Sequence, residues 1–242
     1  MNVRVMGIVN VTPDSFSDGG EFFTPEAALK RAHKLIREGA DILDFGGEST
    51  RPGATPITAD EEWARLEPVL GRLEATARAA VKVSVDTYHP ETAARALACG
   101  ADIVNCVYGE AVAPMLELLR RYPLAQLVAP AAAVTPAMLA EWGARLYLDP
   151  MIGFGTTREE DLERLRSIPA LARRGRVLVG VSRKRIVKKL LGEKVTGKDL
   201  AGNLALALWC ARAGAGVLRV HDVGETVRAL KVTEEVEGEN EG

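Results

Sequence analysis

The chain has 242 residues, of which 31 are Lys or Arg and 33 are Asp or Glu, so its formal net charge at pH 7 is −2. This length suits one large domain that buries a sizeable core. Binding of nucleic acid or of an anionic membrane surface generally needs an excess of basic residues, so we expect neither as a partner.

Three cysteines, Cys99, Cys106 and Cys210, are an odd number without CxxC spacing. That pattern indicates neither a zinc site nor a disulfide framework, and it is typical of a cytoplasmic protein with reduced thiols. The chain does not open on a signal peptide, and no apolar run approaches the roughly 20 residues that cross a bilayer.

Short apolar runs bounded by Gly, Pro or polar residues predict eight strands, at 3–9, 41–45, 81–85, 102–107, 124–128, 145–148, 176–181 and 216–220. The stretches between them are rich in Ala, Leu, Arg and Glu, and they predict helices over 25–38, 60–80, 90–99, 114–121, 159–173, 198–213 and 224–231. Strands that alternate with helices pair in parallel, so the eight strands could close into a barrel or form an open doubly wound sheet.

One helix-to-strand joint recurs four times, each time as Gly-Ala followed by an apolar run, at 39–40, 100–101, 143–144 and 214–215. The four runs end in polar residues: Asp44, Asn105, Asp149, and Arg219 with His221. This recurrence favours a single-domain α/β structure, a (β/α)8 TIM barrel over residues 1–233, with 234–242 as a flexible acidic tail. In such a barrel the C-terminal ends of the strands carry the active site.

The strand-end residues fall into two chemical groups. Asp86, Asn105 and Asp149 supply oxygen acceptors that suit the N–H donors of an aminopyrimidinone ring. Lys184, Arg219 and His221 follow strands seven and eight, where barrels usually bind phosphate, and Asn10 ends the neighbouring first strand. A lone carboxylate such as Asp86 would more often cap the next helix; its occurrence together with the other groups favours a binding site.

Two long Gly- and Pro-rich loops, 10–24 and 46–58, are of a length typical of functional lids. Glu48, in the second loop, could act as a general base or hold the loop by hydrogen bonds.

Five motifs in order resemble those of the dihydropteroate synthase family: GIVNVTPDSFSDGG at 7–20, DFGGESTRPG at 44–53, SVDT at 84–87, GVSRK at 180–184 and RVHDV at 219–223. The resemblance extends over residues 6–231. It implies a Mg²⁺-dependent transferase that condenses 7,8-dihydropterin-6-ylmethyl pyrophosphate with 4-aminobenzoate, on the route to folate, and a homodimer.

The same resemblance assigns roles by position. The positions that hold the pterin correspond to Asp86, Asn105, Asp149 and Lys184. The pyrophosphate end corresponds to Asn10, Arg219 and His221, with Asn10 as the metal ligand. The aminobenzoate side corresponds to Thr50, Arg51, Pro52 and Ser182, and the substrate site also includes Phe154 and Gly180. Asp86, Lys184, Arg219 and His221 are the expected catalytic residues.

Four departures from the family pattern cluster on predicted strands four to six: Cys106, the segment 129–133, Met151 and Thr156. They leave open a divergent pterin-binding paralogue with weak or no catalysis. A folate-binding methyltransferase on the same barrel is a second alternative, but it would need neither the 10–24 loop nor the RVH motif.

Overall fold

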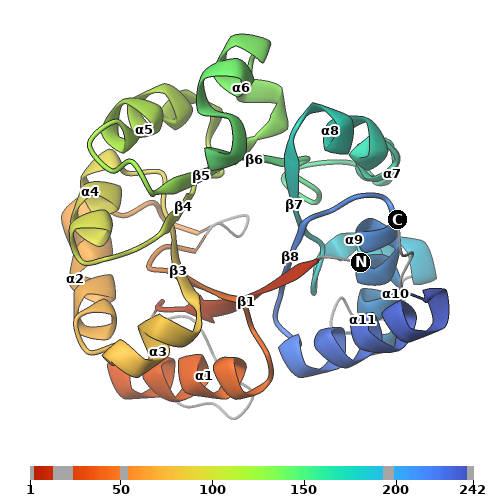
Figure 1. Cartoon of the computed structure of the whole chain (residues 1–242), viewed down its shortest axis with the longest axis horizontal. Coiled ribbons are helices and arrows are strands. Elements are labelled where there is room, and N and C mark those ends of the chain that lie inside the picture. Colours follow the sequence, from red (N-terminus) through yellow and green to blue (C-terminus); the bar gives the residue numbers. More distant parts are fainter. Residues whose placement is uncertain (1–2, 13–23, 50–53, 193–198, 239–242) are drawn as a thin grey trace.

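The computed structural model describes residues 3–12, 24–49, 54–192 and 199–238. Its parallel strands lie side by side in chain order, and the last pairs with the first to close a barrel ringed by helices (Figure 1). The strands are β1 Arg4–Asn10, β2 Ile42–Gly46, β3 Lys82–Asp86, β4 Ile103–Asn105, β5 Gln126–Pro130, β6 Leu146–Asp149, β7 Arg176–Gly180 and β8 Val217–Val220. The closed barrel confirms the predicted (β/α)8 fold and excludes the open sheet.

The helices cover the outside of the barrel (Figure 1). They are α1 Pro25–Arg37, α2 Ala59–Leu70, α3 Ala75–Ala80, α4 Pro90–Ala98, α5 Val112–Leu119, α6 Pro136–Trp142, α7 Arg158–Arg166, α8 Ile168–Arg174, α9 Arg185–Leu191, α10 Leu200–Arg212 and α11 Val223–Glu237. Short 3₁₀ turns lie at η1 Gly109–Ala111, η2 Ala131–Ala133 and η3 Gly143–Arg145.

Several helix predictions differ from the structure. The predicted helix 60–80 is two helices, α2 and α3, and α2 ends at Gly71. The predicted helix 159–173 is also two helices, α7 and α8. Pro169 lies in the first turn of α8 and lacks the N–H that a continuous helix needs. The sequence analysis missed α6 and α9. Helix α11 continues to Glu237, four residues into the segment expected to be a tail.

The recurrent Gly-Ala joint has a backbone explanation. Gly39, Gly100, Gly143 and Gly214 all have positive φ, from 47° to 106°. Residues with a Cβ rarely adopt this conformation, so glycine stops the preceding helix and turns the chain into the next strand.

The barrel interior is built in layers of four side chains, taken alternately from odd and even strands. The lowest layer holds Arg4, Lys82, Gln126 and Arg176; above it lie Ile42, Ile103, Tyr147 and Val217, and then Met6, Ser84, Val128 and Leu178. The next layer, from the even strands, is Asp44, Asn105, Asp149 and Arg219. Polar residues therefore follow two apolar-dominated layers on the same inward face, at the C-terminal end of the strands.

Candidate active site

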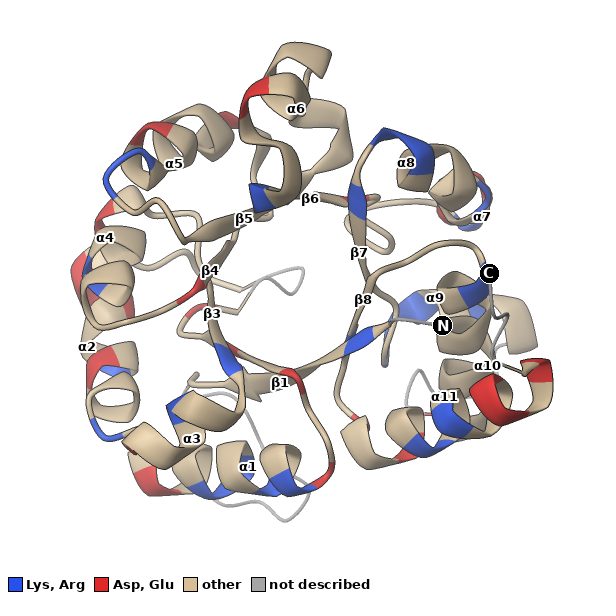
Figure 2. Ribbon diagram, in the orientation of Figure 1, with Lys and Arg blue, Asp and Glu red and all other residues tan. Residues whose placement is uncertain are grey.

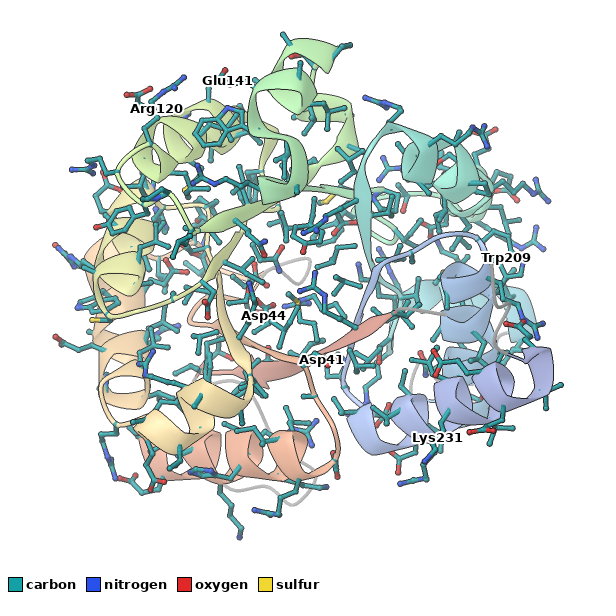
Figure 3. The ribbon with its side chains drawn as sticks, viewed as in Figure 1. Asp41, Asp44, Arg120, Glu141, Trp209 and Lys231 are labelled. Carbon is teal, nitrogen blue, oxygen red and sulfur yellow. The ribbon has the colours of Figure 1, made fainter. Side chains whose placement is uncertain are left out.

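Side chains from β2, β3, β4 and β8 form one hydrogen-bonded network at this polar layer. The Arg219 guanidinium bridges two carboxylates, with Nε 2.6 Å from Asp44 Oδ2 and Nη2 2.6 Å from Asp86 Oδ2. Asp44 also accepts from Ser84 Oγ at 2.6 Å and from Asn105 Nδ2 at 3.2 Å. Figure 3 shows Asp44 inside the barrel.

Asp44 is the central residue of this network; it was expected at the strand ends that carry the site, but it was assigned no role. Its side chain is fully buried, and three donors from three other strands contact it. The signal was present in the sequence, because Asp44 ends the first of the recurrent apolar runs, as Asn105 and Asp149 end the next two.

Arg219 differs from its predicted position. We expected it in a basic corner with Lys184 and His221, whereas its guanidinium lies among the carboxylates and is neutralised by them. Burial opposes its charge, but Asp44 and Asp86 raise the pKa of Arg219 well above its ordinary value. Burial also raises the pKa of Asp86 to about 7, although the positive charge of Arg219 acts to lower that pKa.

Asp149 and Lys184 influence each other electrostatically at the barrel mouth. Burial raises the pKa of Asp149, opposed by the Lys184 charge, and lowers that of Lys184 to about 8. Lys184 Nζ donates to Ile152 O at 2.6 Å and lies 4.3 Å from the centre of the Phe154 ring, a cation–π contact. The ammonium is thus held above the layer that contains Asp149.

His221 and Ser182 lie together at the ends of β8 and β7. Ser182 Oγ is 3.2 Å from His221 Nδ1 and accepts from the His221 amide at 3.2 Å. Burial, reinforced by the nearby Arg183 and Arg219 charges, lowers the pKa of His221 to about 3. His221 is therefore neutral near pH 7 and offers a hydrogen bond, not the positive charge we expected of it.

The remaining predicted residues are placed as follows. A Cβ at Gly180 would lie 3.7 Å from Arg219 Cβ and 3.8 Å from Lys184 Nζ, so Gly180 lies directly against both side chains. Asn10 ends β1 on the same face of the barrel. Thr50, Arg51 and Pro52 lie outside the described residues.

Glu48 is tied to the loop that follows β3. Its Oε1 accepts from Tyr88 Oη at 2.8 Å, and its Oε2 lies 3.4 Å from His89 Nε2. These contacts favour the interpretation of Glu48 as a residue that holds its loop by hydrogen bonds.

The departures on strands four to six have structural consequences. The small residues of η2 and the end of β5 line a recess of about 450 Å³, together with Met151 and Phe154, next to Asp149. Thr156 lies in the loop before α7, and Lys189 from α9 reaches the same loop, donating to Thr156 O at 2.8 Å and lying 3.3 Å from Asp161. A lysine ammonium is therefore present at this loop, supplied by another helix.

We expect Cys106→Ser to leave turnover and the unfolding temperature nearly unchanged. Cys106 is buried, its thiol donates to Tyr108 O at 3.3 Å, and burial raises its pKa to about 11, so it is a packing residue and not a nucleophile. Cys106→Asp would bury a carboxylate against a carbonyl acceptor and should destabilise the fold by about 2–4 kcal/mol. Thermal unfolding and turnover of both variants check this; loss of turnover in folded Cys106→Ser would contradict it.

Among the described residues, no group of three His, Cys, Asp or Glu side chains could hold a metal ion. No described helix is both long and apolar enough to cross a membrane.

Comparison with known proteins gives the family. The family described as "Pterin binding enzyme" matches residues 6–141 and 133–221. The dihydropteroate synthase of Neisseria meningitidis serogroup C is 40% identical, over 96% of this chain and 92% of its own, and that of Streptococcus pyogenes serotype M6 is 36% identical, over 92% and 91%.

Solved structures agree. Dihydropteroate synthase of Xanthomonas albilineans with 4-aminobenzoic acid has a TM-score of 0.85 and 40% identity, covering 98% of this chain and 94% of that one. The same enzyme with 7,8-dihydropteroate has a TM-score of 0.82 and 38% identity, over 98% and 94%. The chain belongs to the dihydropteroate synthase family of pterin-binding enzymes.

Proposed function

We propose how this chain, a transferase of the dihydropteroate synthase family, condenses 7,8-dihydropterin-6-ylmethyl pyrophosphate with 4-aminobenzoate. The observation that carries the proposal is a set of open acceptors in the polar layer. Asn105 Oδ1 is buried and has no hydrogen-bond partner among the described residues. Of the described donors, only the Met151 amide, at 2.7 Å, contacts the Asp149 carboxylate.

Unsatisfied buried acceptors are costly, and a ligand with matching donors removes that cost. The aminopyrimidinone ring of a pterin carries adjacent N–H groups of this kind. We infer that Asp149 and Asn105 hold this ring, with the Lys184 ammonium beside them as a donor to its acceptors.

The charges of the site suit a substrate that ionises by losing pyrophosphate. The pterin methylene C–O bond breaks, and pyrophosphate leaves with the electron pair. The Asp86 and Asp149 carboxylates then stabilise positive charge on the pterin methylene group in a site that is largely shielded from water. The arylamine nitrogen forms the new C–N bond and releases its proton.

Lys184, Arg219 and His221 are proposed to donate hydrogen bonds to the leaving pyrophosphate. The Lys184 ammonium adds positive charge, whereas the charge of Arg219 is already balanced by Asp44 and Asp86. Mg²⁺ is often held by one or two protein oxygens together with substrate phosphates and water, and the Asn10 amide at the end of β1 fits that limited role. Bound there with pyrophosphate, the ion would neutralise charge on the leaving group. Thr50, Arg51, Pro52 and Ser182 are proposed to hold the aminobenzoate.

Product analysis tests this function. Purified protein with dihydropterin pyrophosphate, 4-aminobenzoate and Mg²⁺ should form 7,8-dihydropteroate, identified by mass spectrometry. Tight binding of the pterin pyrophosphate without any condensed product would instead identify a non-catalytic paralogue.

The site predicts a bell-shaped pH dependence of kcat/KM. Asp86, whose pKa is raised to about 7, is ionised only above that pH, so activity should fall as the pH drops through 7. Lys184, whose pKa is lowered to about 8, loses its charge above that pH, so activity should also fall on the alkaline side. Lys184→Arg keeps its charge and should lose the alkaline limb; a wild-type profile that is flat from pH 6 to 9 would contradict these assignments.

We further propose that the chain is a cytoplasmic homodimer. The described cysteines are free thiols, as in reducing compartments. Exposed apolar side chains occur on α9, α10 and α11, including Leu191, Leu200 and Trp209. Figure 3 shows Trp209 on the outside of the barrel. Sedimentation should show a dimer that Trp209→Glu weakens; a monomer at all concentrations would contradict it.

A further inference from the structure

The end of the barrel opposite the active site carries an unusual concentration of positive charge. Each odd strand begins with a residue of the lowest layer, and three of these four residues are cations: Arg4, Lys82 and Arg176. Figure 2 shows the corresponding blue segments on β1, β3 and β7, whereas blue and red segments mix on the outer helices. The fourth residue of the layer is Gln126.

These residues surround an open recess of about 870 Å³. Arg174, from the end of α8, adds a fourth cation to its lining. Glycines at 143, 175, 214 and 216 form part of the wall, and a Cβ at Gly143 would meet no atom within 4 Å. The recess is therefore large enough for a small molecule, and none of the described residues that line it is a carboxylate.

Three of these four cations donate hydrogen bonds to neutral acceptors. Arg4 and Arg176 both donate to the hydroxyl of the buried Tyr147, and both guanidinium carbons lie 5.7 Å from the centre of its ring. Arg176 also donates to Ala144 O at 3.0 Å, and Arg174 to Val134 O at 3.3 Å. No ion pair among the described residues includes any of the four cations.

Two carboxylates at the same end of the barrel are held by backbone amides and not by these cations. Asp41 and Asp102 precede β2 and β4 and accept from the backbone amides of Val5 and Val83, at 2.7 and 2.8 Å. Because the four cations form no ion pair with these carboxylates, they repel one another, and an anion placed between them gains from all of them. Tyr147 holds two guanidinium groups in place for such an anion before it binds.

We propose that this amino-terminal recess binds a small polyanion that carries a di- or triphosphate group. Guanidinium forks match phosphate oxygens by paired hydrogen bonds, and several convergent cations favour more than one negative charge. The Tyr147 hydroxyl and the Gln126 amide provide neutral hydrogen-bond partners in the same recess. The site is distinct from the active site, which lies at the other end of the barrel.

Calorimetric titration with inorganic tripolyphosphate, without divalent metal, tests this site. The Lys82→Gln/Arg176→Gln variant removes two of the cations, and Lys30→Gln/Arg121→Gln removes two exposed positive charges elsewhere as the matched control. Wild type and control should bind at two sites, this recess and the active site, and the recess variant at one, with at least tenfold weaker binding at the other. Equal stoichiometry and affinity in all three proteins would overturn the proposal.

The titration distinguishes failure of the recess site from failure of the proposed active site. If the active site does not bind the probe, wild type should show one site and the recess variant none. A parallel titration with ATP separates a nucleotide from a bare phosphate chain: tighter binding of ATP would assign the recess to nucleotides, and equal binding would assign it to the phosphate chain alone.

Folding and turnover serve as controls. Removing repelling charges should leave the unfolding temperature unchanged or raise it, and without the probe the recess variant should turn over at the wild-type rate. If the double variant does not fold, Arg176→Gln alone should still weaken binding at the recess at least threefold, and wild-type affinity in that single variant would overturn the proposal.

Discussion

Arg219→Ala is expected to lower kcat by at least 10²- to 10³-fold and to destabilise the fold by about 3–5 kcal/mol. The catalytic loss follows because Arg219 is one of the few charged donors at the pyrophosphate end. The loss of stability follows because Asp44, which is fully buried, and Asp86, whose side chain is 12% exposed, would lose the guanidinium that bridges them at 2.6 Å and remain without their counter-charge. Steady-state kinetics and denaturant unfolding measure the two effects.

Arg219→Lys is the matched control for this prediction. It keeps the positive charge but loses the planar fork that contacts two carboxylates at once. We expect it to recover much of the stability and little of the turnover. An Arg219→Ala protein with near-normal kcat and stability would show that the bridge contributes to neither.

Asp44→Asn is expected to lower kcat/KM by about 100-fold and stability by roughly 2–4 kcal/mol. Asp44 accepts hydrogen bonds from Ser84, Asn105 and Arg219, and the amide of an asparagine would bring a donor against other donors. Asn105 would then lose the contact that fixes its side chain, and with it the orientation of the acceptor proposed to bind the pterin.

The control for Asp44→Asn lies at the other end of the barrel. Asp102 accepts from the Val83 amide at 2.8 Å and contacts no active-site residue, so Asp102→Asn should cost stability without changing kcat/KM. If Asp44→Asn and Asp102→Asn give equal kcat/KM values, Asp44 is a structural residue only.

The fold was predictable because its signals are local. Alternation of apolar runs with helical stretches gave all eight strands within two residues at each end, and the Gly-Ala joint marked four helix-to-strand turns that require positive φ. The helix breaks at Gly71 and Pro169 were missed, although both residues are visible in the sequence, and so were the short helices α6 and α9.

The gathering of the strand-end residues at one face was predictable, and their contacts were less so. Asp86, Asn105, Asp149, Lys184 and Arg219 do lie on one face, because each ends or follows a strand. The bridge from Arg219 to Asp44 joins residues 175 positions apart, and no local pattern reveals it. The neutral state of His221 likewise depends on burial and on the nearby Arg183 and Arg219, which only the folded structure brings around it.

The departures on strands four to six could be located from the sequence, but their structural effect could not. They are visible in the sequence, but their effect depends on neighbours: Lys189 reaches the loop of Thr156 from a different helix, and the small residues after β5 leave an open recess. Neither change removes the contacts of Asp149 or Asn105 with the rest of the chain.

Pyrophosphate release from dihydropterin pyrophosphate, followed with and without 4-aminobenzoate in the presence of Mg²⁺, tests the central claim most directly. We expect rapid release that depends on the arylamine, one pyrophosphate for each pterin–benzoate product formed, and its near-complete loss in Lys184→Ala. Folded wild-type protein that binds the pterin pyrophosphate but releases no pyrophosphate when the arylamine is added would contradict the claim.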